Sequence, residues 1–294
     1  MDDNLPAHPP RREIVPRQGP DFGLDGDIPR HWLGGDAFKT RFFDAMSTLF
    51  PEGERFFIAC VRDFRDQIID PALQRQVKDF IYQEGQHNLV HTRFNDRLKA
   101  QGIEVDRILQ KQVDLMFGFF RKRFSRRYTL GMTAAAEHMT ALMAHGFASQ
   151  GVLVDADPRL RAMYAWHAIE EVEHKAVAYD VLTKVAKASY FTRILSFVQT
   201  TFTFPFHVFM IMRHMLDVDG KNTLRVWLKG LWWLYGPRGI YLRLLPHYLV
   251  YFLPGFHPWK YGQMESYERW REVYDRSGDP IAAGDAVMGA VARA

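Results

Sequence analysis

Apolar residues recur every three or four positions through long segments between Asp36 and about Ala188. This is the spacing of amphipathic helices, and the region lacks the apolar-polar alternation of half-buried strands. The dipeptides Asp70-Pro71 and Asp157-Pro158 interrupt the pattern. Each predicts a helix start, because Asp is a good N-cap and Pro suits the first helical position. The pattern predicts an all-α protein whose main helical bundle spans residues 36–190.

The chain changes character on both sides of this region. Residues 1–35 are rich in Pro and Gly and predict an extended N-terminal arm. Residues 191–275 are aromatic-rich and predict a helical extension that packs on the bundle or on a membrane. Because Pro, Lys and Arg interrupt its apolar runs, we expect amphipathic helices there and no simple spanning helix. Residues 276–294 predict a flexible tail.

The two helices that start at Asp-Pro carry the same pair of polar residues. DPALQRQVKDFIYQEGQH contains Glu84 and His87, and DPRLRAMYAWHAIEEVEH contains Glu171 and His174. In both segments the Glu is fourteen and the His seventeen residues after the Asp, which indicates an internal duplication. Residues three apart lie on one face of a helix, so each pair can present a carboxylate and an imidazole to one point.

A two-metal site in a helical bundle also needs a carboxylate from each of two further helices. Glu54 and Glu137 are the candidates. From Glu54 to the turn at Asp70 and back to Glu84 the chain runs about 24 Å out and about 21 Å back, so the two carboxylates return to one level. Glu52 is an alternative to Glu54, which we prefer because it shares a helical face with apolar neighbours. For the whole set, the alternative is an ordinary core in which carboxylates pair with buried His or Arg.

His167 lies one turn before Glu171, at the position that Phe80 occupies in the first half of the duplication. It is a candidate third imidazole ligand. The alternative is a core histidine that binds a backbone carbonyl. Glu170 and Glu173 flank the motif and are expected in solvent or behind the ligands. His91 and His138 are expected to be structural, or to orient ligands.

Two resemblances extend this interpretation. The ligand set is similar in order and spacing to that of the arylamine N-oxygenases, such as p-aminobenzoate N-oxygenase, over roughly residues 50–180. That resemblance implies a ferritin-like four-helix bundle with two Fe ions, Mn or Zn being the alternatives. On the motifs FPEGERFF, QEGQH and WHAIEEVEH, the chain from residue 28 to 259 also resembles a bacterial family of predicted metal-dependent hydrolases. The candidate metal ligands are Glu54, Glu84, His87, Glu137, His167, Glu171 and His174.

Carboxylate and imidazole ligands with open positions are typical of non-haem iron that activates O2. We therefore expect a di-iron oxidoreductase, an oxygenase, desaturase or N-oxygenase, that acts on an apolar or lipid-like substrate. This reaction requires O2 and an electron donor of the ferredoxin or flavin reductase type. The alternative is a two-metal hydrolase that uses Zn, Mn or Fe. Iron storage or a metal-stabilised scaffold is a weaker third hypothesis.

Composition narrows the partners and the compartment. The 294 residues are 47% hydrophobic, with a net charge of +4, and the densest basic run is RKRFSRR at 121–127. No nucleic-acid motif accompanies that run, so a solvated helix end or an anionic membrane surface suits it better. The single cysteine and the Pro-rich polar start predict a cytoplasmic protein. Membrane contact by the aromatic-rich region would make it peripheral on the inner face of the membrane, and a homodimer interface is the alternative for that region.

Overall fold

Seven of the helices begin at a side chain that caps them. In the computed structural model, which describes residues 13–260 and 265–289, the side chain of Asp70 accepts a hydrogen bond from the Ala72 amide and that of Asp157 from the Arg159 amide. Both predicted helix starts are therefore confirmed. The other side-chain caps are Asp36, Ser125, Ser189, Thr223 and Asp279.

The prediction of an all-α fold is confirmed. Within the described residues, the only β-structure is an isolated bridge between Leu33 and Ala156. The α-helices are α1 (Ala37–Arg62), α2 (Pro71–Ala100), α3 (Val105–Val113), α4 (Arg121–Arg123), α5 (Arg126–Ser149), α6 (Pro158–His174), α7 (Val177–Asp180), α8 (Tyr190–Val218), α9 (Leu224–Tyr235), α10 (Ile240–Leu249), α11 (Glu265–Ser277) and α12 (Pro280–Met288). Two π-helical segments are η2 (Asp114–Phe120) and η3 (Val181–Val185), and single 3-10 turns are η1 (Arg65–Gln67), η4 (Val250–Phe252) and η5 (Pro258–Lys260).

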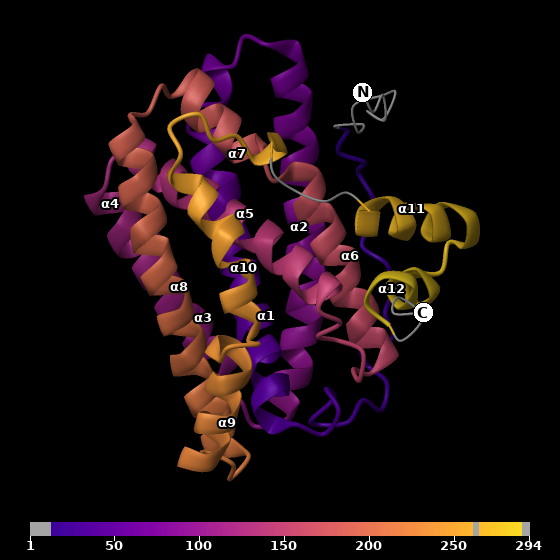
Figure 1. The fold of residues 1–294 in the computed structure, drawn as a ribbon. Coiled ribbons are helices and arrows are strands. Elements are labelled where there is room, and N and C mark those ends of the chain that lie inside the picture. The colour runs from indigo at the N-terminus through magenta and orange to yellow at the C-terminus, as the bar shows by residue number, and fades with distance from the viewer. Residues whose placement is uncertain (1–12, 261–264, 290–294) are drawn as a thin grey trace.

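Four helices carry all the candidate ligands. Helix α1 packs against α2, and α5 packs against α6. Helix α8 lies along one side of the molecule against α1 and α5, whereas α11 and α12 lie on the opposite side near α6 (Figure 1). The domain boundary at residue 190 stays a prediction.

Three of the four helices, α1, α2 and α5, cross from one apolar core to another with their candidate ligands between the two, whereas α6 belongs to the first core and α7 follows it into the second. On α1, Leu49 belongs to the first core and Phe56 to the second. On α2, Phe80 belongs to the second core and Val90 to the first. The chain therefore places its polar residues in one layer between two apolar clusters.

The predicted flexible tail was wrong for residues 280–288, which form α12. Its buried residues include Ala283 and Val287, and it packs directly on α6. Contact is close because Gly284 lies against the backbone of Ala162, where a Cβ would come within 2.7 Å of the Ala162 Cα. An ion pair between Arg161 and Asp285 joins the same two helices. The last part of the predicted tail, residues 290–294, lies outside the described residues.

Helix α8 differs from our expectation for the aromatic extension. Among the described residues, α8 is the one helix that is long enough and apolar enough to cross a membrane. Only 28% of its most apolar window is buried. Its inner face packs on α1 and α5 through residues that include Phe197, Val208 and Met212. As folded, α8 is therefore a surface helix of the bundle. The first twelve residues of the predicted arm lie outside the described residues, and the arm from residue 13 follows the bundle surface.

Candidate metal centre

All seven predicted ligand side chains come together in one buried cluster. Single ligand atoms of Glu84, His87, Glu171 and His174 lie within 4.8 Å of one another. A second group with the same spacing joins His87 to Glu54 and His167. Because the two groups share His87, they adjoin each other.

Glu171 lies at the centre of the cluster. Its Oε1 is 3.2 Å from His167 Nε2, 3.8 Å from His87 Nδ1 and 4.0 Å from His174 Nε2. Its other oxygen accepts a hydrogen bond from the Thr140 hydroxyl on α5. Glu137 belongs to neither group, and its Oε2 lies 2.8 Å from His174 Nδ1.

Seven atoms of the cluster have no hydrogen-bond partner among the described residues. They are both carboxylate oxygens of Glu54 and of Glu84, together with His87 Nδ1, His174 Nε2 and Glu137 Oε1. Buried polar atoms without partners cost about 1–3 kcal/mol each. Cations would provide partners for these donor atoms, so the residues fit metal ions.

The pKa values of the carboxyl groups also indicate that the cluster lacks positive charge. Burial, and then repulsion by Glu171 and Glu137, holds the pKa of Glu54 well above its usual range. Burial and repulsion by Glu137, Glu171 and Glu54 do the same for Glu84. Burial raises the pKa of Glu137 to about 7 although the neighbouring His174 lowers it. Divalent cations would offset this crowding of carboxylates.

Each imidazole is held at the nitrogen that faces away from the interior. His87 Nε2 is 3.1 Å from Glu170 Oε2, and His167 Nδ1 is 2.9 Å from His91 Nε2. His91 in turn contacts Ser47 through its other nitrogen at 2.7 Å. A carboxylate or imidazole partner of this kind fixes the orientation of a metal-binding histidine.

Glu170 and Glu173 were expected in solvent or behind the ligands, and neither lies in solvent. Both are buried, and the guanidinium of Arg17 from the N-terminal arm pairs with both carboxylates. Glu173 also accepts a hydrogen bond from Gln83. No sequence pattern indicated Arg17, because nothing in a Pro-rich arm shows where it packs.

Two neighbours of the motif behave as expected. His91 orients another histidine, and His138 packs among aromatic rings that include Phe197 and Tyr251, away from the cluster. Glu52 forms an ion pair with Arg55 at 2.7 Å, whereas Glu54 is 2% exposed and faces the cluster. The geometry therefore favours Glu54 over Glu52.

The comparison with protein families adds the reaction class. A family model described as "Predicted metal-dependent hydrolase" matches residues 16–262. The chain belongs to this family. No curated protein and no solved structure gives a significant match. The family description agrees with the buried Glu and His group, and it identifies a metal-dependent protein without stating which metal it uses.

This match corrects our expectation of a di-iron oxygenase. The family is one of hydrolases, so the expected oxidoreductase was wrong and the alternative is the better supported one. The comparisons give no support to the resemblance to the arylamine N-oxygenases. O2 and an electron donor were requirements of the oxidative reaction, and hydrolysis needs neither. Carboxylate and imidazole ligands occur in both classes of site, so ligand type alone did not separate them.

Proposed function

We propose that this protein is a hydrolase that uses two adjacent divalent metal ions. The observation that carries the proposal is the buried cluster of seven Glu and His side chains, five of which have atoms with no hydrogen-bond partner among the described residues. Membership of the hydrolase family supports the reaction class. In such sites divalent metals polarise the scissile carbonyl or phosphoryl group and lower the pKa of water.

Residues of both groups would hold the ions. Glu84 and His174 would bind one ion, and Glu54 and His167 the other, with Glu171 between them. His87 and Glu137 complete the set. Carboxylate and imidazole donors without a thiolate suit Zn, Mn or Fe.

The surrounding side chains would keep these ligands in place. Glu170 and His91 orient His87 and His167, and Thr140 holds one oxygen of Glu171. With the imidazoles and the carboxylate already positioned, metal binding requires little reorganisation.

An apolar cavity next to the cluster supports a substrate with an apolar part. The ring of Phe50 stacks on His167 at 4.7 Å between centroids, and Phe50 also lines a cavity of about 110 Å³. The rest of its lining is largely apolar and includes Phe56, Met132 and Phe204. We propose that this cavity receives the hydrophobic part of a small-molecule or lipid substrate.

Metal analysis combined with hydrolysis of model substrates tests the proposal. Protein loaded with Zn or Mn is expected to retain about two ions per chain and to hydrolyse p-nitrophenyl esters or phosphates, with loss of turnover on chelation. Glu171→Gln should lose both the metal and the turnover. Glu52→Gln, which changes a carboxylate paired with Arg55, should keep both. Turnover that survives chelation and Glu171→Gln would contradict the proposal.

A further inference from the structure

The outer face of α8 is apolar and uncovered. Phe191, Leu195, Phe202, Phe206 and Met210 are all exposed, with Phe202 73% exposed. Their spacing of four or seven residues places them on one face of the helix. The opposite face packs on α1 and α5. Helix α8 thus presents a continuous apolar strip to its surroundings.

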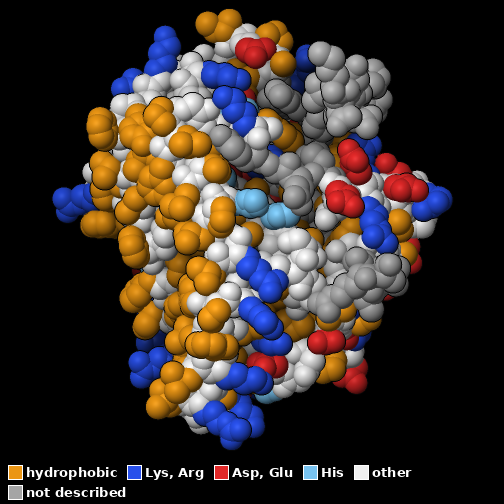
Figure 2. Space-filling view, viewed as in Figure 1, with side chains coloured by type: hydrophobic (Ala, Val, Ile, Leu, Met, Phe, Trp, Pro, Cys, Tyr) orange, Lys and Arg blue, Asp and Glu red, His pale blue; other side chains and the backbone are white. Residues whose placement is uncertain are grey.

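Helices α9 and α10 continue this strip. The exposed residues of α9 include Leu224, Leu228 and Trp232, again at intervals of four, and those of α10 include Leu242 and Leu249. Figure 2 shows the result as a broad hydrophobic area over the side of the molecule formed by α8 and α9, with Lys and Arg at its edges. Exposed patches of this extent mark interaction sites.

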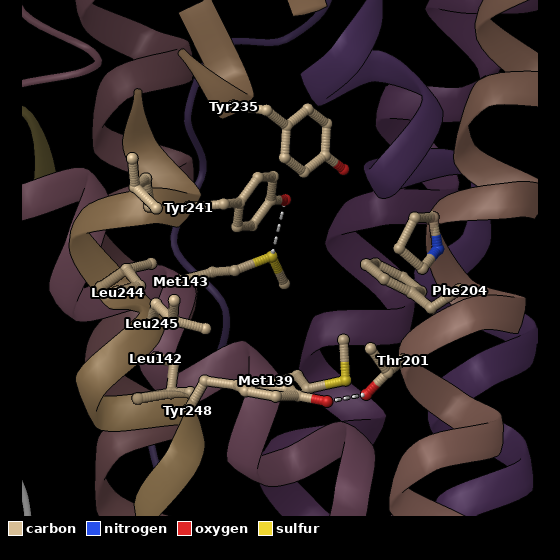
Figure 3. A pocket seen from close by; sticks show the side chains of 12 residues that line it. Met139, Leu142, Met143, Thr201, Phe204, Tyr235, Tyr241, Leu244, Leu245 and Tyr248 are labelled. Atoms are coloured by element: carbon tan, nitrogen blue, oxygen red, sulfur yellow. Dashed lines mark hydrogen bonds between the residues drawn. The ribbon is translucent and has the colours of Figure 1, made fainter. Parts of the chain in front are cut away.

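A pocket opens between the same helices. It has a volume of about 340 Å³ and lies between α8, represented by Phe204, and α10, represented by Leu245 (Figure 3). Its polar lining includes the hydroxyl groups of Tyr235, Tyr241 and Tyr248. Phe204 also lines the smaller cavity beside Phe50, so one side chain borders both spaces.

The charge of this part of the chain is strongly one-sided. Residues 181–264 contain ten Lys or Arg residues and two acidic ones, Asp217 and Asp219. Arg213, Arg225 and Arg243 are exposed and have no ion-pair partner in the described part of the chain. An apolar face edged by unpaired cations is complementary to anionic lipid headgroups over acyl chains.

We propose that the face formed by α8, α9 and α10 docks on the surface of an anionic lipid bilayer. The helices lie in the plane of the headgroups, with the strip containing Phe202 and Trp232 in the acyl boundary and the arginines among the phosphates. Helix α8 does not cross the bilayer in this arrangement, because its inner face is part of the bundle core. This docking does not depend on the proposed hydrolysis.

Sedimentation with phospholipid vesicles tests the docking. The full chain is expected to pellet with vesicles of mixed phosphatidylcholine and phosphatidylglycerol, and much less with phosphatidylcholine alone or at high salt. A variant with Phe202→Glu and Trp232→Glu should bind at least tenfold more weakly. These side chains are 73% and 69% exposed, so the fold should tolerate both changes.

The matched control places the same charges on exposed apolar residues of another surface. Ile69 and Leu89 are 91% and 56% exposed; Ile69 lies just before α2, and Leu89 lies within it. Ile69→Glu with Leu89→Glu should leave vesicle binding unchanged. Circular dichroism checks that each variant is folded.

Three results would overturn the proposal. The first is that wild-type protein does not pellet with anionic vesicles. The second is that the Phe202 and Trp232 variant pellets as well as wild type does. The third is that wild type does not bind vesicles and is a dimer by analytical ultracentrifugation, whereas the variant is a monomer. The face would then be an interface between two copies of the chain.

Discussion

Every imidazole of the metal cluster depends on a side chain outside the ligand set or on a second carboxylate. Glu170 is the partner of His87 and also accepts hydrogen bonds from Trp166 and Arg17. Burial raises the pKa of Glu170 to about 8, against the opposing effect of Arg17. Because Glu170 lies behind His87, we regard it as a positioning residue. Its loss should weaken metal binding more than it destabilises the fold.

We predict that Glu170→Gln weakens metal binding about 10–100-fold, because the amide no longer offers a carboxylate to His87 Nε2. The glutamine still accepts the Trp166 hydrogen bond, so the free energy of unfolding of the metal-free protein should change little. Competition with a chromophoric chelator measures the dissociation constant. Glu52→Gln is the control, and equal metal affinity in both variants would show that Glu170 does not act through His87.

At this scale the sequence was informative about residue types and uninformative about contacts. The matched Glu and His registers identified both half-sites, and the apolar neighbours of Glu54 separated it from Glu52. Glu170 lies next to Glu171 in sequence but points to a different part of the cluster, because successive helical residues are about 100° apart. Only the position of α2 beside α6 brings Glu170 to His87, and a sequence pattern contains no such information.

At the scale of elements, a charged contact holds the end of α8 to α1. Asp219, at the C-cap of α8, accepts hydrogen bonds from Arg41 of α1 and is paired with His31 and Arg30 of the arm. Arg41 also pairs with Asp44. Burial alone would raise the pKa of Asp219, but its bonds with Arg41, His31 and Arg30 hold it well below its usual range.

We predict that Asp219→Asn lowers the free energy of unfolding at pH 7 by about 2 kcal/mol. A carboxyl group whose pKa is lower in the folded than in the unfolded state stabilises the fold at a pH above its unfolded pKa of about 4. This contribution is lost as the pH falls toward the folded pKa. The difference between wild type and variant should therefore shrink below about pH 4. Urea unfolding of both proteins above and below about pH 4 measures the difference in free energy of unfolding. A difference that does not change with pH would show that it does not come from the ionised Asp219.

Helix α12 is held to α6 by a close approach at Gly284. We predict that Gly284→Ala destabilises this docking by about 1–3 kcal/mol, because the new methyl group meets backbone that cannot move easily. Hydrogen exchange should increase in residues 280–288 and remain slow in α1. Gly118→Ala adds a Cβ with no heavy atom of a packing neighbour within 4 Å and is the control. Unchanged exchange in α12 would show that the helix adapts.

The elements themselves were largely predictable, and their docking was not. Asp-Pro pairs identified the starts of α2 and α6 because capping is local chemistry. Residues 280–288 carry a comparable signal in Asp279 and Pro280, yet their small-residue composition suggested a flexible tail. What orders α12 is the surface of α6, more than one hundred residues earlier in the chain. The same limit explains the arm, whose Arg17 reaches a site that its own sequence does not indicate.

At the scale of the whole molecule, the polar cluster interrupts what would otherwise be one continuous apolar core. Four helices place carboxylates and imidazoles in a layer between the two apolar clusters. Such a layer is unfavourable without counter-charge, since burial and mutual repulsion raise the pKa of Glu54 and Glu84. The fold as a whole should therefore be more stable with metal bound.

We predict that chelation lowers the unfolding temperature and that Zn or Mn restores it. A ligand that binds only the folded state at one hundred times its dissociation constant adds about 2.7 kcal/mol, which corresponds to roughly 4–5 °C for a chain of this size. Glu171→Gln should lose this response, because it alters the carboxylate that contacts all three ligand histidines. Differential scanning calorimetry with and without EDTA measures the shift. If EDTA does not change the unfolding temperature of wild type, the carboxylates are compensated by other groups of the protein, and the cluster is an ordinary buried polar network. If EDTA lowers the unfolding temperature of wild type and not that of Glu171→Gln, the polar layer is a metal site on which the stability of the whole fold depends.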